Sequence, residues 1–100
     1  MKWREKREPV TVRREIKVVN ELGLHARPAA QFVRRANAFR SEIWLVRDEQ
    51  RFSARSLIEV LRANLNCGDT AVLEAHGVDA EDAVEALEKL VTEFADEMSA

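Results

Sequence analysis

The chain has 100 residues, of which 46% are hydrophobic and 34% are charged, as is typical of a globular domain and not of a disordered protein. A domain of this size has little room for a deep, enclosed active site, so we expect surface chemistry performed with a partner. The formal net charge of -2 gives no electrostatic reason to expect a nucleic-acid ligand.

Location and cofactors follow from what the composition lacks. The sequence has no apolar run of the length that a signal peptide or a membrane span needs. Its single cysteine, Cys67, cannot form an internal disulfide, and no Cys or His pattern near it is typical of a metal site. We therefore predict a cytoplasmic protein without membrane insertion, metal or cofactor, and we assign no role to Cys67.

The first nine residues differ from the rest of the chain. They carry four basic and two acidic side chains and one large apolar side chain, Trp3. This composition favours a flexible N-terminal arm over residues 1–9. The domain is then expected over residues 10–96, with a short C-terminal tail over 97–100.

The first two elements differ in their period. From Val10 to Val19, β-branched residues are interleaved with charged ones, which predicts a half-buried strand. Gly23 breaks this pattern. The following apolar residues recur at helical spacing and predict a helix with one buried face: Ala29, Phe32, Val33 and Ala36.

A hairpin and a short helix are expected in the middle of the chain. Residues 43–46 and 51–54 predict two strands, joined by a polar turn over 48–50. A short helix follows and should end within residues 64–68. Its apolar residues lie on one side: Leu57, Ile58 and Leu61.

The last two elements are a strand over residues 70–75 and a long helix. Asp79 is expected to be the N-cap of this helix, with Glu81 and Asp82 at the positive end of its dipole. Apolar residues keep helical spacing from Ala80 to Phe94, so a sheet should cover this face. The order β-α-β-β-α-β-α predicts an α+β open-faced sandwich, with three helices on one face of a four-stranded antiparallel sheet.

The segment with the clearest chemistry is Gly23-Leu24-His25-Ala26-Arg27-Pro28-Ala29, between the first strand and the first helix. Histidine is nucleophilic at neutral pH without a separate base. The free amides of a helix N-terminus, here at Ala26 and Arg27, bind anions, and a guanidinium pairs with phosphate oxygens through two hydrogen bonds. Pro28 suits the first turn of a helix.

This segment resembles the active-site signature of the HPr family, the histidine-containing phosphocarriers of the bacterial sugar phosphotransferase system, and the resemblance extends over about residues 11–94. It implies that His25 is phosphorylated on Nδ1 and that Arg27 contacts the phosphate. Enzyme I is implied as the donor, charged from phosphoenolpyruvate, and IIA domains of sugar transport complexes as the acceptors. The protein would be a phosphoryl-transfer intermediate, expected as a monomer, and not a stand-alone enzyme.

A second segment, Arg55-Ser56-Leu57-Ile58, resembles the Lys-Ser site at which some family members are modified by a serine kinase and its phosphorylase. Ser56 is therefore a regulatory candidate, although Glu59 stands where many members have glycine. The other interpretation of Ser56 is a plain N-cap. By the same resemblance, Leu57, Ile58 and Leu61 belong in part to the docking surface for enzyme I and the acceptors.

Two alternatives differ in class from a phosphocarrier. One is a regulatory HPr-like binding module controlled by phosphorylation at Ser56, against which the presence of His25 and Arg27 argues. The other is a hydrolase or nuclease with His25 as a base, which lacks a carboxylate partner and a metal cluster in the sequence. His76 has no partner motif and is expected to be an exposed residue at the end of a strand.

Overall fold

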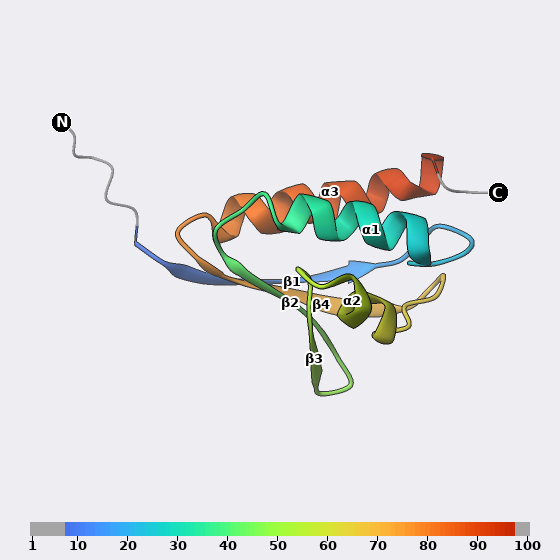
Figure 1. Cartoon of the computed structure of the whole chain (residues 1–100), viewed down its shortest axis with the longest axis horizontal. Helices are drawn as coiled ribbons and strands as arrows, with labels where there is room; N and C mark the ends of the chain where they lie inside the picture. Colours follow the sequence, from blue (N-terminus) through green and yellow to red (C-terminus); the bar gives the residue numbers. More distant parts are fainter. Residues whose placement is uncertain (1–7, 98–100) are drawn as a thin grey trace.

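The computed structural model describes residues 8–97, with side chains described as far as residue 95. Most of the predicted arm and the last three residues of the predicted tail therefore lie outside the described residues. The seven predicted elements occur in the predicted order (Figure 1): β1 (Val10–Lys17), α1 (Ala26–Ala36), β2 (Glu42–Arg47), β3 (Gln50–Ser53), α2 (Leu57–Arg62), β4 (Thr70–Gly77) and α3 (Ala80–Glu97).

All strand pairs of the sheet are antiparallel, and the strand order is β1-β4-β2-β3. The prediction that the first strand reaches Val19 is wrong by two residues. Lys17 is paired with Thr70, where β4 begins, so no strand faces the residues that follow. Val18 is instead held by the loop before β4, donating to Asp69 O at 2.9 Å and accepting from Gly68 N at 2.7 Å.

The helices bury the apolar face of the sheet. In Figure 1, α1 and α3 run along the same side of the sheet; α3 contacts β1, β4 and β2, and α2 packs against α1 and β3. Side chains that alternate along the central strands point into this layer, which explains the predicted periods. The largest fully buried residues of the core include Phe32, Ile43, Leu45, Leu73, Leu87 and Phe94.

The other face of the sheet carries charged side chains around Trp44. The Arg51 guanidinium lies 4.5 Å from the centroid of the Trp44 ring, which is a cation–π distance. Arg51 and Arg13 also pair with Glu74, at 3.3 and 3.5 Å. Glu74 is the register partner of both Arg13 and Trp44, so these side chains share one face of the sheet, opposite the buried Leu73.

Asp79 directly precedes α3, as predicted, and its carboxylate also binds the loop between α1 and β2. It accepts hydrogen bonds from Arg40 N at 2.9 Å, Ser41 N at 3.0 Å and Ser41 Oγ at 2.6 Å. Burial alone would raise the pKa of the Asp79 carboxyl, but the hydrogen bonds from Arg40 and Ser41 lower it below its usual value. The carboxylate thus ties the start of α3 to the far end of α1.

Candidate active site

The loop that leads into α1 is folded tightly against the loop that follows α2. Gly23 has a φ of +70°, and a Cβ there would lie 2.6 Å from Leu65 O and 2.8 Å from Asn66 Cα. Leu24 is buried and donates from its backbone to Leu65 O at 2.9 Å. A glycine is therefore required at this position both for its backbone angle and for the space.

His25 is the N-cap residue of α1. Its backbone is extended, with φ -82° and ψ -168°, and its N–H donates to Gly23 O at 2.9 Å. The side chain is half-buried and makes no capping hydrogen bond to the helix. No hydrogen bond within residues 8–97 engages the imidazole, so its nitrogens stay available for chemistry.

Two backbone amides follow the histidine at the positive end of the α1 dipole. Within residues 8–97, the N–H groups of Ala26 and Arg27 have no acceptor, Pro28 has no N–H, and the first to bond back is Ala29 N, to His25 O at 2.9 Å. The first turn of α1 contains no acidic residue. Ala26 and Arg27 are exposed, and the Arg27 guanidinium makes no ion pair or hydrogen bond within the same range. This arrangement suits an anion at the imidazole.

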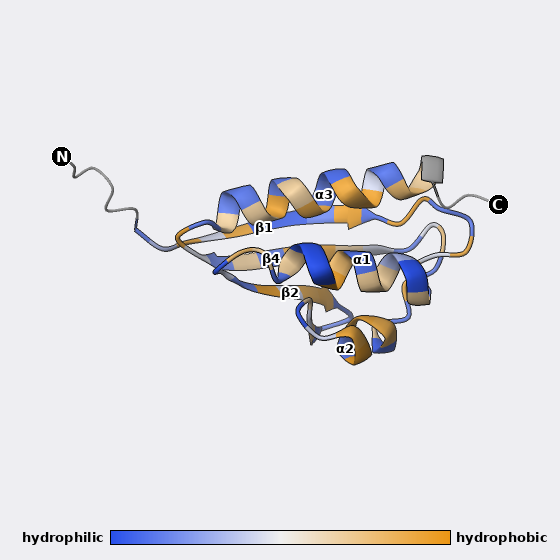
Figure 2. Cartoon of the chain, turned by 45° about the horizontal axis from the view of Figure 1, so that its top comes forward, coloured by the Kyte–Doolittle hydropathy of each residue, from blue (hydrophilic) through white to orange (hydrophobic). Residues whose placement is uncertain are grey.

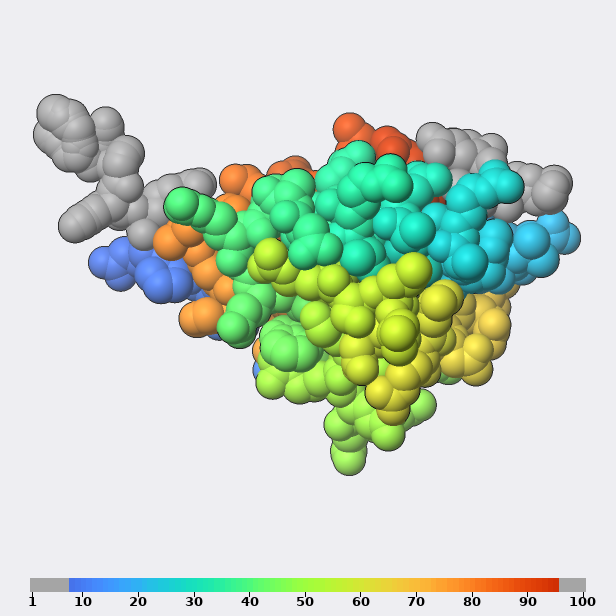
Figure 3. Space-filling view, in the orientation of Figure 1, coloured from blue at the N-terminus to red at the C-terminus, as the bar shows by residue number. Residues whose placement is uncertain are grey.

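Three apolar residues of α2 are exposed, and Figure 2 shows the ribbon of this helix largely in the hydrophobic colour. Leu57, Ile58 and Leu61 are 39%, 70% and 40% exposed, whereas Val60 and the C-cap residue Ala63 are buried. The sequence left open whether these three residues belong to the core or to a docking surface, and the structure shows that they are exposed. Figure 3 shows α2 at the surface beside α1, the helix that His25 precedes.

Ser56 lies at the opposite end of α1 from His25. It is the N-cap of α2, and its Oγ accepts from Glu59 N at 3.3 Å. The preceding Arg55 donates to Asn37 Oδ1 at 3.0 Å, just after the last turn of α1. An 11-residue helix is about 16 Å long, so Ser56 does not belong to the anion site.

Sequence reasoning missed three residues of this region. Asn20 is fully buried in the loop before His25, Leu22 is 62% exposed beside it, and the Leu65 carbonyl supports the loop from below. None of them follows a helical or strand period, and the contact with Leu65 joins positions 41 residues apart, from 24 to 65. Only the turn-forming pair Asn20 and Gly23 could have indicated a tight loop.

The second histidine lies away from this site. His76 is exposed, as predicted, but it lies within β4 and has a partner: its Nδ1 is 2.7 Å from Thr11 Oγ1 on β1. It has no place beside the helix N-terminus.

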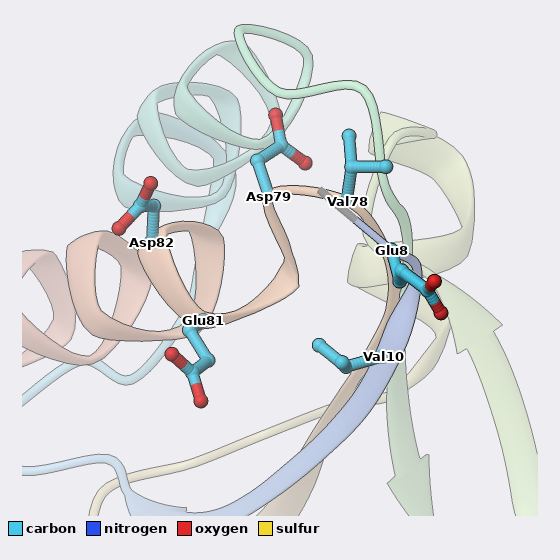
Figure 4. A pocket seen from close by; sticks show the side chains of 6 residues that line it. All are labelled: Glu8, Val10, Val78, Asp79, Glu81 and Asp82. Atoms are coloured by element: carbon cyan, nitrogen blue, oxygen red, sulfur yellow. The ribbon is translucent and has the colours of Figure 1, made fainter. Parts of the chain in front are cut away.

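A hollow at the start of α3 has the wrong charge for an anion (Figure 4). Four carboxylate side chains and two valines line it: Glu8, Val10, Val78, Asp79, Glu81 and Asp82. It lies beside β1 and the far end of α1, away from His25.

No helix among residues 8–97 is both long and apolar enough to cross a membrane. Within the same part of the chain, no cluster of His, Cys, Asp and Glu side chains is arranged to bind a metal.

Comparison with known proteins identifies the family. A family model described as "PTS HPr component phosphorylation site" matches residues 12–93. The chain belongs to the HPr family. The phosphocarrier protein HPr of Treponema pallidum is 41% identical over 75 residues, which make up 75% of this chain and 85% of the relative. HPr proteins are phosphocarriers and not stand-alone enzymes.

Solved HPr structures have the same fold. HPr from Thermoanaerobacter tengcongensis superimposes with a TM-score of 0.81 at 35% identity, covering 85% of this chain and 96% of that one. Crh, a catabolite repression protein of Bacillus subtilis, superimposes with a TM-score of 0.67 at 35% identity, covering 82% and 94%. That Crh structure is a dimer with a swapped domain. The monomeric state of the present chain therefore stays a prediction.

Proposed function

We propose that this HPr protein accepts a phosphoryl group from phosphorylated enzyme I on Nδ1 of His25 and transfers it to IIA domains of sugar transport complexes in the cytoplasm. One observation carries the proposal: among residues 8–97, an imidazole without a hydrogen bond stands directly before two amides without acceptors and a guanidinium without an ion pair. Because the chain belongs to a phosphocarrier family, we infer that the anion bound by this arrangement is a phosphoryl group.

The transfer needs no further catalytic group on this chain. The Nδ1 lone pair forms a bond to phosphorus, while the bond from phosphorus to the donor atom on enzyme I breaks and its electron pair stays on the donor. The equatorial oxygens gather negative charge during this step. The N–H groups of Ala26 and Arg27, at the start of α1, and the Arg27 guanidinium would bind these oxygens and stabilise the transition state.

The same site suits the return step. Imidazole is a good leaving group, so a phosphoryl group bound to Nδ1 remains transferable: the acceptor forms a bond to phosphorus as the P–N bond breaks and its electron pair returns to Nδ1. The exposure of Ala26 and Arg27 leaves the phosphate open to an acceptor, as a carrier requires. We infer that the exposed Leu57, Ile58 and Leu61 dock enzyme I and the IIA domains in turn, because they lie on the helix that packs beside α1.

The experiment is incubation of the full chain with enzyme I and phosphoenolpyruvate. Intact mass should show one added phosphate, labile to acid and stable to base. The variant His25→Ala should gain none and should keep the melting temperature of the wild type. His76→Ala is the matched control, since it removes the other histidine, and it should be phosphorylated normally. Phosphate uptake by His25→Ala, or no uptake by the wild type, would refute the proposal.

A second role is favoured by the similarity to Crh. We propose that phosphorylation of Ser56 by a serine kinase, reversed by a phosphorylase, would turn the protein into a regulatory binding module. The serine is half-buried as the N-cap of α2, with the Glu59 carboxylate in the first turn of the helix. Treatment with a family serine kinase followed by peptide mapping tests this role independently of His25.

A further inference from the structure

We propose that Asn20 is a positioning residue for phosphoryl transfer at His25. It orients the peptide unit before the histidine without touching the phosphate. The inference rests on the proposed function of His25, and it adds a residue that neither the helix nor the signature segment contains.

Asn20 closes the loop before His25 from two sides. Its side chain is fully buried, and Nδ2 donates to Gly23 O at 2.7 Å. Its backbone O accepts from Gly23 N at 3.0 Å. A fully buried side chain whose Nδ2 is engaged in this way does not reach a phosphate at the surface, so any effect on transfer must pass through Gly23.

The Gly23 carbonyl is the point at which this effect reaches the histidine. It accepts both Asn20 Nδ2 at 2.7 Å and His25 N at 2.9 Å. Two donors on one carbonyl fix the orientation of the peptide unit between Gly23 and Leu24. Because the His25 amide is already bonded to Gly23 O, the amides left to face an anion at the imidazole are those of Ala26 and Arg27.

The unused half of the Asn20 side chain indicates which atom matters. Oδ1 is buried and has no hydrogen-bond partner within residues 8–97, which is unfavourable for a polar atom. An apolar side chain of the same size would fill this position without that penalty. A buried asparagine at position 20 is explained if the loop requires a hydrogen-bond donor to Gly23 O, which Nδ2 provides.

The prediction concerns rate more than affinity. In-line transfer depends on the position of the nucleophile, and a displacement of about 1 Å can lower a rate by about a hundredfold. Within residues 8–97, no hydrogen bond links the Asn20 amide to the apolar residues of α2, where we infer that enzyme I docks. Loss of the amide should therefore slow the chemical step and leave the docking of enzyme I unchanged.

The experiment measures single-turnover transfer from phosphorylated enzyme I at several concentrations of enzyme I, at a temperature where each variant is fully folded. Asn20→Ala should lower the maximal rate at least about tenfold, while the half-saturating concentration stays within about twofold. The matched control is Asn37→Ala, which removes an amide bonded to Val33 O and Arg55 O at the far end of α1 and should transfer at the wild-type rate.

Several outcomes would overturn the inference. A wild-type maximal rate in Asn20→Ala would do so, as would equal slowing in Asn20→Ala and Asn37→Ala. If Asn20→Ala does not fold, Asn20→Asp keeps the size of the side chain and replaces the donor with an acceptor, and it should be slowed at least as much. In the wild type, the His25 amide should exchange its hydrogen more slowly than the Ala26 amide, and equal exchange would contradict the hydrogen bond to Gly23 O. If the wild type takes no phosphate on His25, the proposed function fails first, and the role of Asn20 fails with it.

Discussion

Replacement of Gly23 by alanine tests how strongly the candidate site depends on the contact between two loops. The added Cβ would lie 2.6 Å from Leu65 O and 2.8 Å from Asn66 Cα. Both are backbone atoms, which cannot turn aside as a flexible side chain would. The alanine must also adopt a φ of +70°. The loop has to move, and Leu24 then loses its hydrogen bond to Leu65 O.

Gly68 separates the two causes of the expected loss. It has a φ of +93°, and a Cβ there would meet nothing within 4 Å. Gly68→Ala should therefore cost only the left-handed backbone, about 1 to 2 kcal/mol. Gly23→Ala adds steric overlap of about 1 to 3 kcal/mol and one backbone hydrogen bond of about 1 kcal/mol.

Thermal unfolding of the two variants gives the measurement. For a domain of this size, 1 kcal/mol corresponds to about 4 to 8 °C in melting temperature. Gly23→Ala should therefore melt at least about 8 °C below Gly68→Ala. It should also accept phosphate more slowly when both are fully folded, because His25 moves with the loop. Equal melting temperatures in the two variants would refute the reasoning that the loops are in close contact.

Three further changes have defined outcomes. Arg27→Ala should slow phosphate uptake about 10- to 150-fold, since one charge-assisted contact contributes about 1.5 to 3 kcal/mol, and should not change the melting temperature. Asp79→Asn should lower the free energy of unfolding by about 2 kcal/mol at pH 7. Folding lowers the pKa of Asp79. Its contribution to the free energy of unfolding is therefore complete above the pKa of the unfolded state and is lost as the pH falls through the pKa of the folded state. The difference between Asp79→Asn and the wild type, measured by urea unfolding, should vanish in acid. Ser56→Asp should slow His25 phosphorylation without lowering the melting temperature, and a wild-type rate would leave Ser56 as a cap only.

The sequence predicts the fold well because most of its elements have a regular period. Phe32, Val33 and Ala36 recur at the spacing of a helix, and the structure forms α1 around them. The errors lie at the ends of elements. Whether Val18 belongs to β1 depends on where β4 begins, and this is decided by the turn around Gly68, far along the chain.

The candidate site is predicted in part, for a related reason. His25 and Arg27 are adjacent in a recognisable segment, so their types and order already indicate the chemistry. The loop beneath them depends on contacts with no local pattern, such as that between Leu24 and Leu65. The sequence also could not decide which apolar residues of α2 face inward, because a six-residue helix is too short to show a clear period.

The nucleophile and its support should differ in what they contribute to the fold. The His25 side chain makes no capping hydrogen bond, so its removal takes away chemistry and little stability. Gly23 and Asn20 are buried and hydrogen-bonded to each other, so changes there should affect stability and transfer together. The reactive histidine is thus held by the backbone on either side of it, with a helix after His25 and a closed loop before it.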